Sequence, residues 1–452
     1  MLAKAFRNFM IRRTISAKLR NRGMNTFSNH EILVNLRKSS EEKREEENRP
    51  HEVIYFHKVD DPYSHLTIHF VDKLLSTFDI TLVPILVGEE DSDSVHEPTL
   101  YNKYCLEDAT RIAPYYGIDF SPDSHPRQTL VDLSNAILTA VEDHKFIELA
   151  RTVSKALWQE DENTLKELSK EYNSTESEVS QNLKEGNSIR NEKGYYFGSA
   201  FYYEKELYWG VDRIHHLEDR LIELGVKNDL INEPICAPRL KSPVSFESSK
   251  KVDLHYYPSL NSPYTYVSAK RVRELRDNYP VNLVTRPVLP MLMRNMTIPQ
   301  YKAKYIISDA AREGRKNDYP MGEIYSPIGK PARKAYSLFP AIDEAGKGFE
   351  YIDELLRASF YEGINIGEDE YLQSLVESLN LDWSFIKKDL NSRKWKKVLD
   401  QNLQDMYAGN CWGVPSFKIT DQDGSNPFYL WGQDRMWLLK EEIFKRIGSP
   451  DD

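Results

Sequence analysis

Three short segments carry residues whose types and positions could do chemistry. Ser262 stands directly before Pro263, a pairing typical of the start of a helix, where unpaired amide groups gather. The tripeptide GVP at 413–415 precedes an apolar stretch, and Gln433 and Asp434 open the last helical pattern. The simplest interpretation makes Ser262 and Asp434 ordinary caps and the proline an ordinary trans residue at a strand start. The functional alternative is a hydroxyl that donates a hydrogen bond to a ligand.

Other reactive side chains are sparse. The three cysteines, Cys105, Cys236 and Cys411, are scattered and form no CxxC pair, which argues against a dithiol enzyme and a cysteine zinc site. Their number favours a reducing compartment, so we expect a cytoplasmic location. His65 and His69 share a helix face, but no third ligand is evident and no metal site is predicted. Glycine-rich phosphate motifs and the nucleophile-elbow motif are absent from the sequence.

Composition limits the classes of protein that fit. The 452 residues suggest three domains or two large ones, and 40% hydrophobic residues can form a packed core. The longest apolar run, residues 80–88, is too short to span a membrane. The net charge is −10, although residues 1–27 hold seven basic residues and no acid. A nucleic-acid binder would carry a basic body, so we expect small-molecule or protein ligands and no nucleic acid.

The basic N-terminal segment allows several interpretations. It lacks the apolar core of a secretory signal and is arginine-rich, as transit peptides are. It could be a poorly ordered basic tail, a helix docked on the acidic body, a peripheral membrane contact through residues 1–22, or a cleaved presequence. Residues 39–50 read as a mixed-charge linker, so residues 1–50 form one segment and folded structure is expected from His51.

Internal similarity is the most informative feature of the chain. Asp61-Pro-Tyr-Ser recurs as Ser262-Pro-Tyr-Thr, 201 positions later, and Tyr104-x3-Asp-x2-Arg recurs as Tyr305-x3-Asp-x2-Arg at the same separation. FGSA at 197–200 matches WGVP at 412–415, and WGVDR at 209–213 matches WGQDR at 431–435. Four landmarks in one order predict two tandem domains, residues 51–245 and 250–447; the family resemblance described below implies that the two act as a pseudo-dimer within one chain.

The elements of the second copy follow from the same pattern. A strand at 252–256 leads to a helix that begins at SPYT, and a second strand covers 281–286. A long helical block runs from about 298 to 407. Strands at 416–419 and 428–431 enclose a turn, and a last helix starts at Asp434. This order predicts an α/β fold of two thioredoxin-like domains, each with a helical insertion.

These motifs give the second copy a family resemblance. SPYT at 262–265, WGVPSF at 412–417 and FYLWGQDRM at 428–436 resemble the DsbA superfamily, within it the branch of 2-hydroxychromene-2-carboxylate isomerases and kappa-class glutathione transferases. Asn295 and the pair Lys302 and Lys304 are weaker matches. The resemblance covers nearly all of residues 250–447.

The resemblance implies a cofactor and a set of roles. The slot at 262–265 holds a CxxC pair in the oxidoreductases of the superfamily, whereas here the implied cofactor is glutathione, with Ser262 stabilising its sulfur. A cis peptide before Pro415 would let the backbone of Val414 pair with the tripeptide. Gln433 and Asp434 would receive the γ-glutamyl end, and Asn295 would contribute a further contact.

The first copy departs from the pattern at its site. Asp61 places a carboxylate where Ser262 stands, and like charges repel a thiolate. Ala200 is aligned with Pro415, and Val211 with Gln433. We therefore expect the first domain to be a non-catalytic partner.

The sequence thus predicts a glutathione-dependent isomerase- or transferase-like enzyme that acts on a small conjugated or aromatic electrophile. The alternative is a non-catalytic thioredoxin-fold binding scaffold, which could associate with a membrane surface.

Overall fold

The computed structural model describes residues 14–89, 93–228, 234–236 and 248–448. Their contacts divide the chain into two compact units, each with its own sheet. The first unit is Val34–Arg239, and the second unit combines Met1–Leu33 with Leu240–Asp452.

The first unit consists of one sheet and a set of helices between its second and third strands. In chain order its elements are β1 (Glu52–His57), α4 (Pro62–Thr77), β2 (Thr81–Leu86), α5 (Pro98–Ile112), η1 (Ala113–Tyr116), α6 (Gln128–Thr139), α7 (Asp143–Trp158), α8 (Glu162–Leu168), α9 (Glu176–Glu192), β3 (Ala200–Tyr203), β4 (Glu206–Trp209) and α10 (Ile214–Glu223).

The second unit repeats this order with a longer helical block. Its elements are α2 (Thr14–Ser28), β5 (Val252–Tyr257), α11 (Pro263–Asn278), β6 (Val281–Thr285), η2 (Met291–Arg294), α12 (Gln300–Lys316), α13 (Lys330–Glu344), α14 (Gly348–Phe360), α15 (Asp369–Ser378), α16 (Trp383–Ile386), η3 (Lys387–Asp389), α17 (Lys394–Ala408), β7 (Ser416–Asp421), β8 (Phe428–Trp431), η4 (Gln433–Arg435) and α18 (Met436–Ile447).

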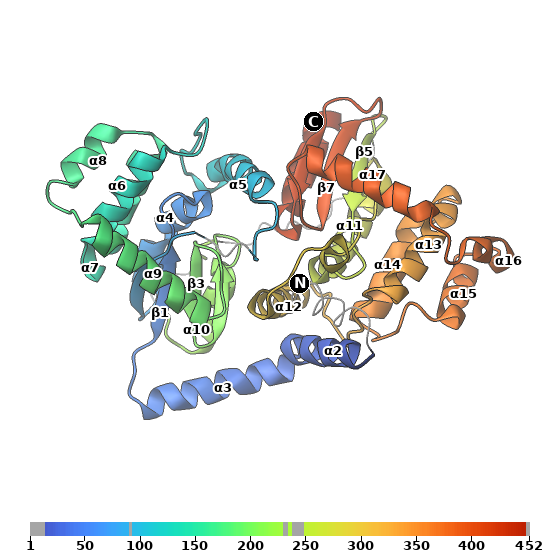
Figure 1. Ribbon diagram of the computed structural model, residues 1–452, viewed down its shortest axis with the longest axis horizontal. Coiled ribbons are helices and arrows are strands. Elements are labelled where there is room, and N and C mark those ends of the chain that lie inside the picture. The colour runs from blue at the N-terminus through green and yellow to red at the C-terminus, as the bar shows by residue number, and fades with distance from the viewer. Residues whose placement is uncertain (1–13, 90–92, 229–233, 237–247, 449–452) are drawn as a thin grey trace. The chain divides into compact units, whose positions relative to one another are not determined.

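The two sheets have the same topology. Their strand orders are β2-β1-β3-β4 and β6-β5-β7-β8. In each sheet, the first two strands of the unit are parallel neighbours, and one helix, α4 or α11, connects them in the sequence. The other neighbouring strands are antiparallel. Figure 1 shows α6, α7 and α8 to one side of the first sheet and α13, α14, α15 and α16 to one side of the second. The predicted α/β class is confirmed by these two mixed sheets.

Matching contacts recur at the predicted separation of 201 residues. The hydroxyl of Tyr63 donates to Asp108 over 2.8 Å, and that of Tyr264 donates to Asp309 over 2.7 Å. Both tyrosines belong to the first turn of the helix that follows the first strand. The duplication of the chain itself stays a prediction.

The pairing register corrects one step of the predicted alignment. The amide of Gly210 donates to the carbonyl of Ser199, and the amide of Gly432 donates to that of Pro415. Ser199, rather than Ala200, therefore occupies the position of Pro415. The sequence pattern aligns Gly198 with Gly413, whereas the strand register shifts the first copy by one residue and makes Gly198 equivalent to Val414.

The core of the second unit reaches the loop in front of Ser262. A cluster of buried apolar residues joins α11 to α12, α13, α14, α15 and α17. Leu260, two residues before Ser262, is fully buried in this cluster, and its amide donates to the hydroxyl of Tyr336 over 3.1 Å. The loop is therefore fixed by burial as well as by hydrogen bonds.

The predicted linker at 39–50 is wrong, as is the expected start of folded structure near His51. Helix α2 begins at Thr14, and α3 (His30–Glu46) covers most of the charged stretch. Its opposite charges lie three or four residues apart, as in the pair Arg44–Glu41 at 2.6 Å, and such pairs support a helix. Residues 14–28 are likewise a helix docked on the second unit, not a poorly ordered tail, while residues 1–13 lie outside the described residues.

Among the described residues, no helix combines the length and the apolar character needed to cross a bilayer.

Two buried histidines of the first unit are held neutral. His57 on β1 and His65 on α4 are 1% and 3% exposed, and burial lowers the pKa of each to about 3. The Nδ1 atom of His57 meets the Tyr55 hydroxyl at 3.1 Å and that of His65 meets Ser154 at 2.8 Å, whereas both Nε2 atoms are buried without a partner. His65 also stacks on Phe120 within the core.

The first unit should therefore lose stability in acid. A histidine whose folded pKa is lowered contributes stability above its unfolded pKa of about 6.5, and this contribution falls by about 1.4 kcal/mol per pH unit as the pH drops toward the folded pKa. We expect hydrogen exchange of the β1 amides in the full chain to accelerate steeply between pH 6 and pH 4, after correction for intrinsic exchange. His65→Gln should reduce this pH dependence, and exposed His144→Gln should leave it unchanged. Equal slopes for His65→Gln and the wild type would contradict the assignment.

Candidate functional site

Ser262 lies where a strand, a loop and a helix meet. It is the N-cap of α11, its side chain accepts a 3.1 Å hydrogen bond from the amide of Thr265, and Pro263 opens the helix. Its amide donates to the carbonyl of Ser259, which closes the preceding turn. The hydroxyl in turn donates to the carbonyl of Val414 over 3.4 Å. The side chain is thus a cap and also a link to a second predicted segment.

The GVP segment stands directly beside this cap. The peptide between Val414 and Pro415 is cis, as the resemblance implied. Pro415 is buried and Val414 half-buried, and β7 begins at the next residue. The carbonyl of Pro415 accepts a 2.9 Å hydrogen bond from the amide of Gly432. Because Gly432 directly precedes Gln433 and Asp434, these contacts bring all three predicted motifs together near the start of β7 and the end of β8.

Two tryptophans, Trp412 and Trp431, pack beside Gly413 of the GVP segment, and we call this pair the tryptophan wall. The rings of Trp412 and Trp431 lie 5.3 Å apart. A Cβ atom on Gly413 would come within 2.5 Å of the Trp431 ring, so only glycine fits there. The buried Trp412 Nε1 atom has no hydrogen-bond partner, and neither has the buried Thr265 Oγ1 atom. Two polar atoms next to the site in sequence are therefore unsatisfied, which favours a polar ligand.

Gln433 and Asp434 have different environments. Gln433 is 1% exposed, and its amide nitrogen donates to Glu313 over 2.8 Å and also to Asp434. Its side-chain and main-chain oxygens accept hydrogen bonds from Arg271 of α11. Both amide hydrogens are thus used within the protein, whereas Asp434 is half-buried. Of the two, Asp434 is the better placed to meet a ligand, and contact of either with glutathione stays a prediction.

Asn295 is linked to the GVP segment through its neighbour Arg294. It is exposed, has a left-handed backbone with φ of 69°, and ends the short helix η2. Its neighbour Arg294 donates to the carbonyl of Trp412 over 3.3 Å. This hydrogen bond connects the η2 turn to the residue before the GVP segment, and among the described residues Asn295 itself makes no hydrogen bond to Ser262 or Val414.

Lys302 adds a buried cation close to the tryptophan wall. It is 5% exposed, and its Nζ atom lies 5.4 Å from the centre of the Trp412 ring. Burial lowers the pKa of Lys302 to about 8. The sequence offered only a weak motif match for this residue, because neither its burial nor its position over Trp412 follows from local spacing.

The equivalent slot of the first unit is filled by the protein's own carboxylate. Asp61 caps α4, and its oxygens accept hydrogen bonds from the amides of Tyr63 and Ser64 at 3.2 and 3.0 Å and from the Ser64 hydroxyl at 2.8 Å. A Cβ atom on Gly198 would lie 3.2 Å from Asp61 Oδ2, so this carboxylate also meets the segment equivalent to GVP. The negative charge thus occupies the helix N-terminus that an anion would need.

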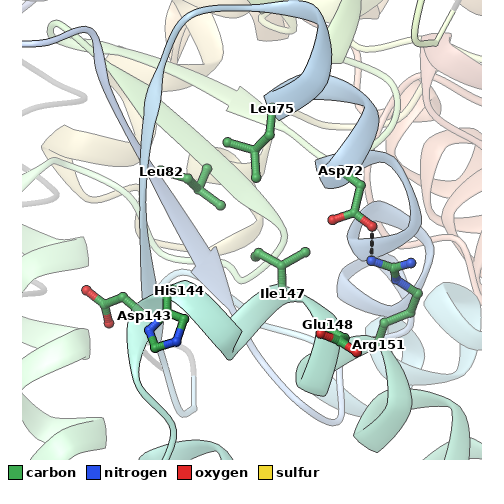
Figure 2. A pocket seen from close by; sticks show the side chains of 8 residues that line it. All are labelled: Asp72, Leu75, Leu82, Asp143, His144, Ile147, Glu148 and Arg151. Carbon is green, nitrogen blue, oxygen red and sulfur yellow. Dashed lines mark hydrogen bonds and ion pairs between the residues drawn. The ribbon is translucent and has the colours of Figure 1, made fainter.

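The first unit also has a solvent-facing hollow of about 530 Å³ that is separate from these residues. Figure 2 shows Leu75, Leu82 and Ile147 between the Asp72–Arg151 ion pair on one side and Asp143 with His144 on the other. Its acidic walls are exposed, and none of the predicted site residues lines it.

Comparisons with known proteins agree with this geometry in the second unit. The model of the DSBA-like thioredoxin domain matches residues 253–444. The uncharacterized protein YwbO of Bacillus subtilis (strain 168) is 34% identical over 88 residues, which are 19% of this chain and 44% of YwbO. The chain thus spans less than half the length of this curated relative.

Two solved structures are similar to part of this chain at low identity. A 2-hydroxychromene-2-carboxylate isomerase is 18% identical, with a TM-score of 0.36, over 43% of this chain and 95% of its own. The cytosolic disulfide reductase DsbM from Pseudomonas aeruginosa is 18% identical, with a TM-score of 0.34, over 43% of this chain and 98% of its own.

The superfamily predicted from the three motifs is confirmed by the family match, whereas the isomerase or transferase activity stays a prediction. With its strand order and its motifs around Ser262, the second unit of this chain contains a DsbA-like thioredoxin domain.

Proposed function

We propose that the second unit binds glutathione at the N-terminus of α11 and acts as an isomerase- or transferase-type enzyme on a small conjugated electrophile. The observation that carries the proposal is the contact of Ser262 with Val414. A neutral hydroxyl at a helix N-terminus, next to a backbone segment that can pair with a peptide, suits a ligand with an anionic sulfur.

The residues present fit this ligand. The Ser262 hydroxyl can turn from the Val414 carbonyl to a sulfur atom, and the N-terminal end of the α11 dipole adds favourable potential for negative charge. Val414 is half-buried and can offer its backbone to a peptide, while Asp434 offers a carboxylate to an ammonium group. The unpaired polar atoms of Thr265 and Trp412 would gain partners.

The chemistry follows from these roles. When bound, glutathione would supply a thiolate for addition to an electron-poor carbon of a conjugated double bond: its loss after rotation about the resulting single bond would give an isomer, and uptake of a proton from water at the neighbouring carbon would give a conjugate. The Ser262 hydroxyl holds the sulfur deprotonated by donating to it. Trp412 of the tryptophan wall and the buried Lys302 would restrict the access of water to the GVP segment.

Removing the hydroxyl should weaken the binding of glutathione. A hydrogen bond to a charged group contributes about 1.5–3 kcal/mol, so we expect Ser262→Ala to raise the dissociation constant roughly 10- to 100-fold. Ser262→Asp should abolish binding, because it reproduces the carboxylate of the first unit and repels a thiolate. Isothermal titration calorimetry of the full chain measures both effects.

Asp61→Ala is the matched control, since it removes the equivalent cap of the other unit. It should destabilise the first unit by about 1 kcal/mol and leave glutathione affinity unchanged. A wild-type chain that shows no binding at millimolar glutathione would defeat the proposal.

Thiol-disulfide exchange by the chain itself should be absent. Ser262 and Thr265 fill the slot of the reactive pair, and Cys105 and Cys411 are 3% and 0% exposed. Burial raises the pKa of the Cys105 thiol, which further suppresses its reactivity. In an insulin-reduction assay with dithiothreitol, the wild type should match the rate without protein, and turnover above that rate would overturn this expectation.

A binding scaffold remains the second candidate, and one feature of α2 favours it. Leu19 is 61% exposed and lies between exposed Lys18 and Arg22, a combination that suits an anionic membrane surface. Here the protein would bind at a membrane through residues 1–22 and need no catalysis.

A charge reversal tests this second candidate. The pair Lys18→Glu and Arg22→Glu should reduce partitioning onto vesicles with 30% phosphatidylserine at least about tenfold, since each basic residue contributes about 1 kcal/mol near such a surface. The control pair Lys166→Glu and Lys170→Glu changes the same charge on exposed residues of the first unit. Equal partitioning of both pairs and the wild type would contradict a membrane role.

A further inference from the structure

Helix α2 is hydrogen-bonded to an extended segment of the second unit. Asn21 and Asn25 lie one turn apart, and their side-chain oxygens accept from the amides of Ser326 and Ile324 at 2.9 and 2.8 Å. The amide nitrogen of Asn25 also donates to the carbonyl of Ile324 over 3.0 Å. Two asparagines thus satisfy backbone groups as a neighbouring strand would. The segment at 324–326 depends on α2 for these partners.

The end of α2 is fixed on the helix that lies beside it. The carbonyl of Phe27 accepts from Ser308 over 3.3 Å, and that of Ser28 accepts from Arg315 over 3.4 Å. Lys304 lies 5.5 Å from the centre of the Phe27 ring. All three partners belong to α12, and Figure 1 shows α2 close to this helix. The docking therefore uses both halves of α2 and does not depend on a single contact.

Arg20 extends this docking toward the candidate site. Its Nε atom donates to the hydroxyl of Ser326 over 2.8 Å, and its Nη2 atom donates to the carbonyl of the same residue over 3.2 Å. The Ser326 hydroxyl in turn donates to the side-chain oxygen of Asn261 over 2.6 Å. Ser326 is 1% exposed, so water cannot easily replace either bond. A continuous path of hydrogen bonds runs from Arg20 to the residue before Ser262.

The last residues of the loop before α11 are each held by a different contact. Leu260 is held by the core and by Tyr336, and the amide of Ser262 is held by Ser259. Between them, the side chain of Asn261 is held by Ser326. Asn261 and Ser262 share a peptide bond, so a displacement of Asn261 would be passed directly to the residue that caps α11.

We propose that Arg20 is a positioning residue of the Ser262 site, which acts through Ser326 and Asn261 from a helix more than 230 residues earlier in the chain. Helix α2 then helps to hold the loop that carries Ser262. The effect on glutathione rests on the proposed function, whereas the effect on the cap does not.

A double-mutant cycle tests the path in the full chain. Arg20→Met keeps most of the side-chain stem and removes the donors, and Asn261→Ala removes the acceptor. Hydrogen exchange of the Thr265 amide reports directly on the cap, because this amide donates to Ser262. Each single change should accelerate that exchange by about tenfold, and the double change should add little beyond either one. Arg22 is the next arginine of the same helix and is exposed, so Arg22→Met should leave the exchange rate of the Thr265 amide unchanged.

Affinity for glutathione separates this inference from the proposed function. If the wild type binds glutathione, Arg20→Met should weaken binding about three- to tenfold, and Arg20→Lys, which keeps one donor, should restore part of it. If the wild type does not bind, the proposed function fails, yet the exchange cycle still decides the role of Arg20.

Multiplicative effects in the double variant would overturn the inference, since they would mean that Arg20 and Asn261 act independently. Exchange of Thr265 that stays at the wild-type rate in Arg20→Met would overturn it as well. Should Arg20→Met melt far below the wild type, Ser326→Ala replaces it in the cycle, with the same expected non-additivity.

Discussion

The candidate site depends on how the N-terminus of α11 is capped. A helix begins with amide groups that have no partner inside the helix, and the residue before it decides what they meet. In the second unit that residue is Ser262, which caps Thr265 and at the same time reaches the carbonyl of Val414. The strand pairs of β7 and β8 hold the GVP segment and Gly432 in place, because these residues lie directly before β7 and directly after β8.

The same slot gives the two units different chemistry on one topology. Asp61 caps its helix with a carboxylate that also accepts a hydrogen bond from Ser64, and this negative charge would repel an anion at the same N-terminus. Ser262 caps with a neutral group and leaves the potential of the helix available. Under the proposed function, the ligand would bring its own negative charge to the helix N-terminus of the second unit.

Much of this could be predicted from the sequence, because the informative signals were local. The start of α11 at SPYT, the strands on either side of the 421–425 turn and the mixed sheet follow from turn and cap residues and from alternation. What failed depended on partners distant in the chain. The charged stretch of α3 looks like a linker until its ion pairs are seen, and the role of Ser199 appears only from the pairing of Gly210. The internal hydrogen bonds of Gln433 and the path from Arg20 likewise join residues that no local pattern connects.

The central claim is that Ser262 stabilises a thiolate, and the ionisation of glutathione bound to the full chain tests it most directly. Thiolate absorbance in the ultraviolet, followed against pH at saturating protein, gives the pKa of the bound thiol. The account predicts a value well below that of a free thiol, about 8.5, and a return toward that value in Ser262→Ala. A bound thiol that titrates like the free one, in the wild type as in the variant, would contradict it.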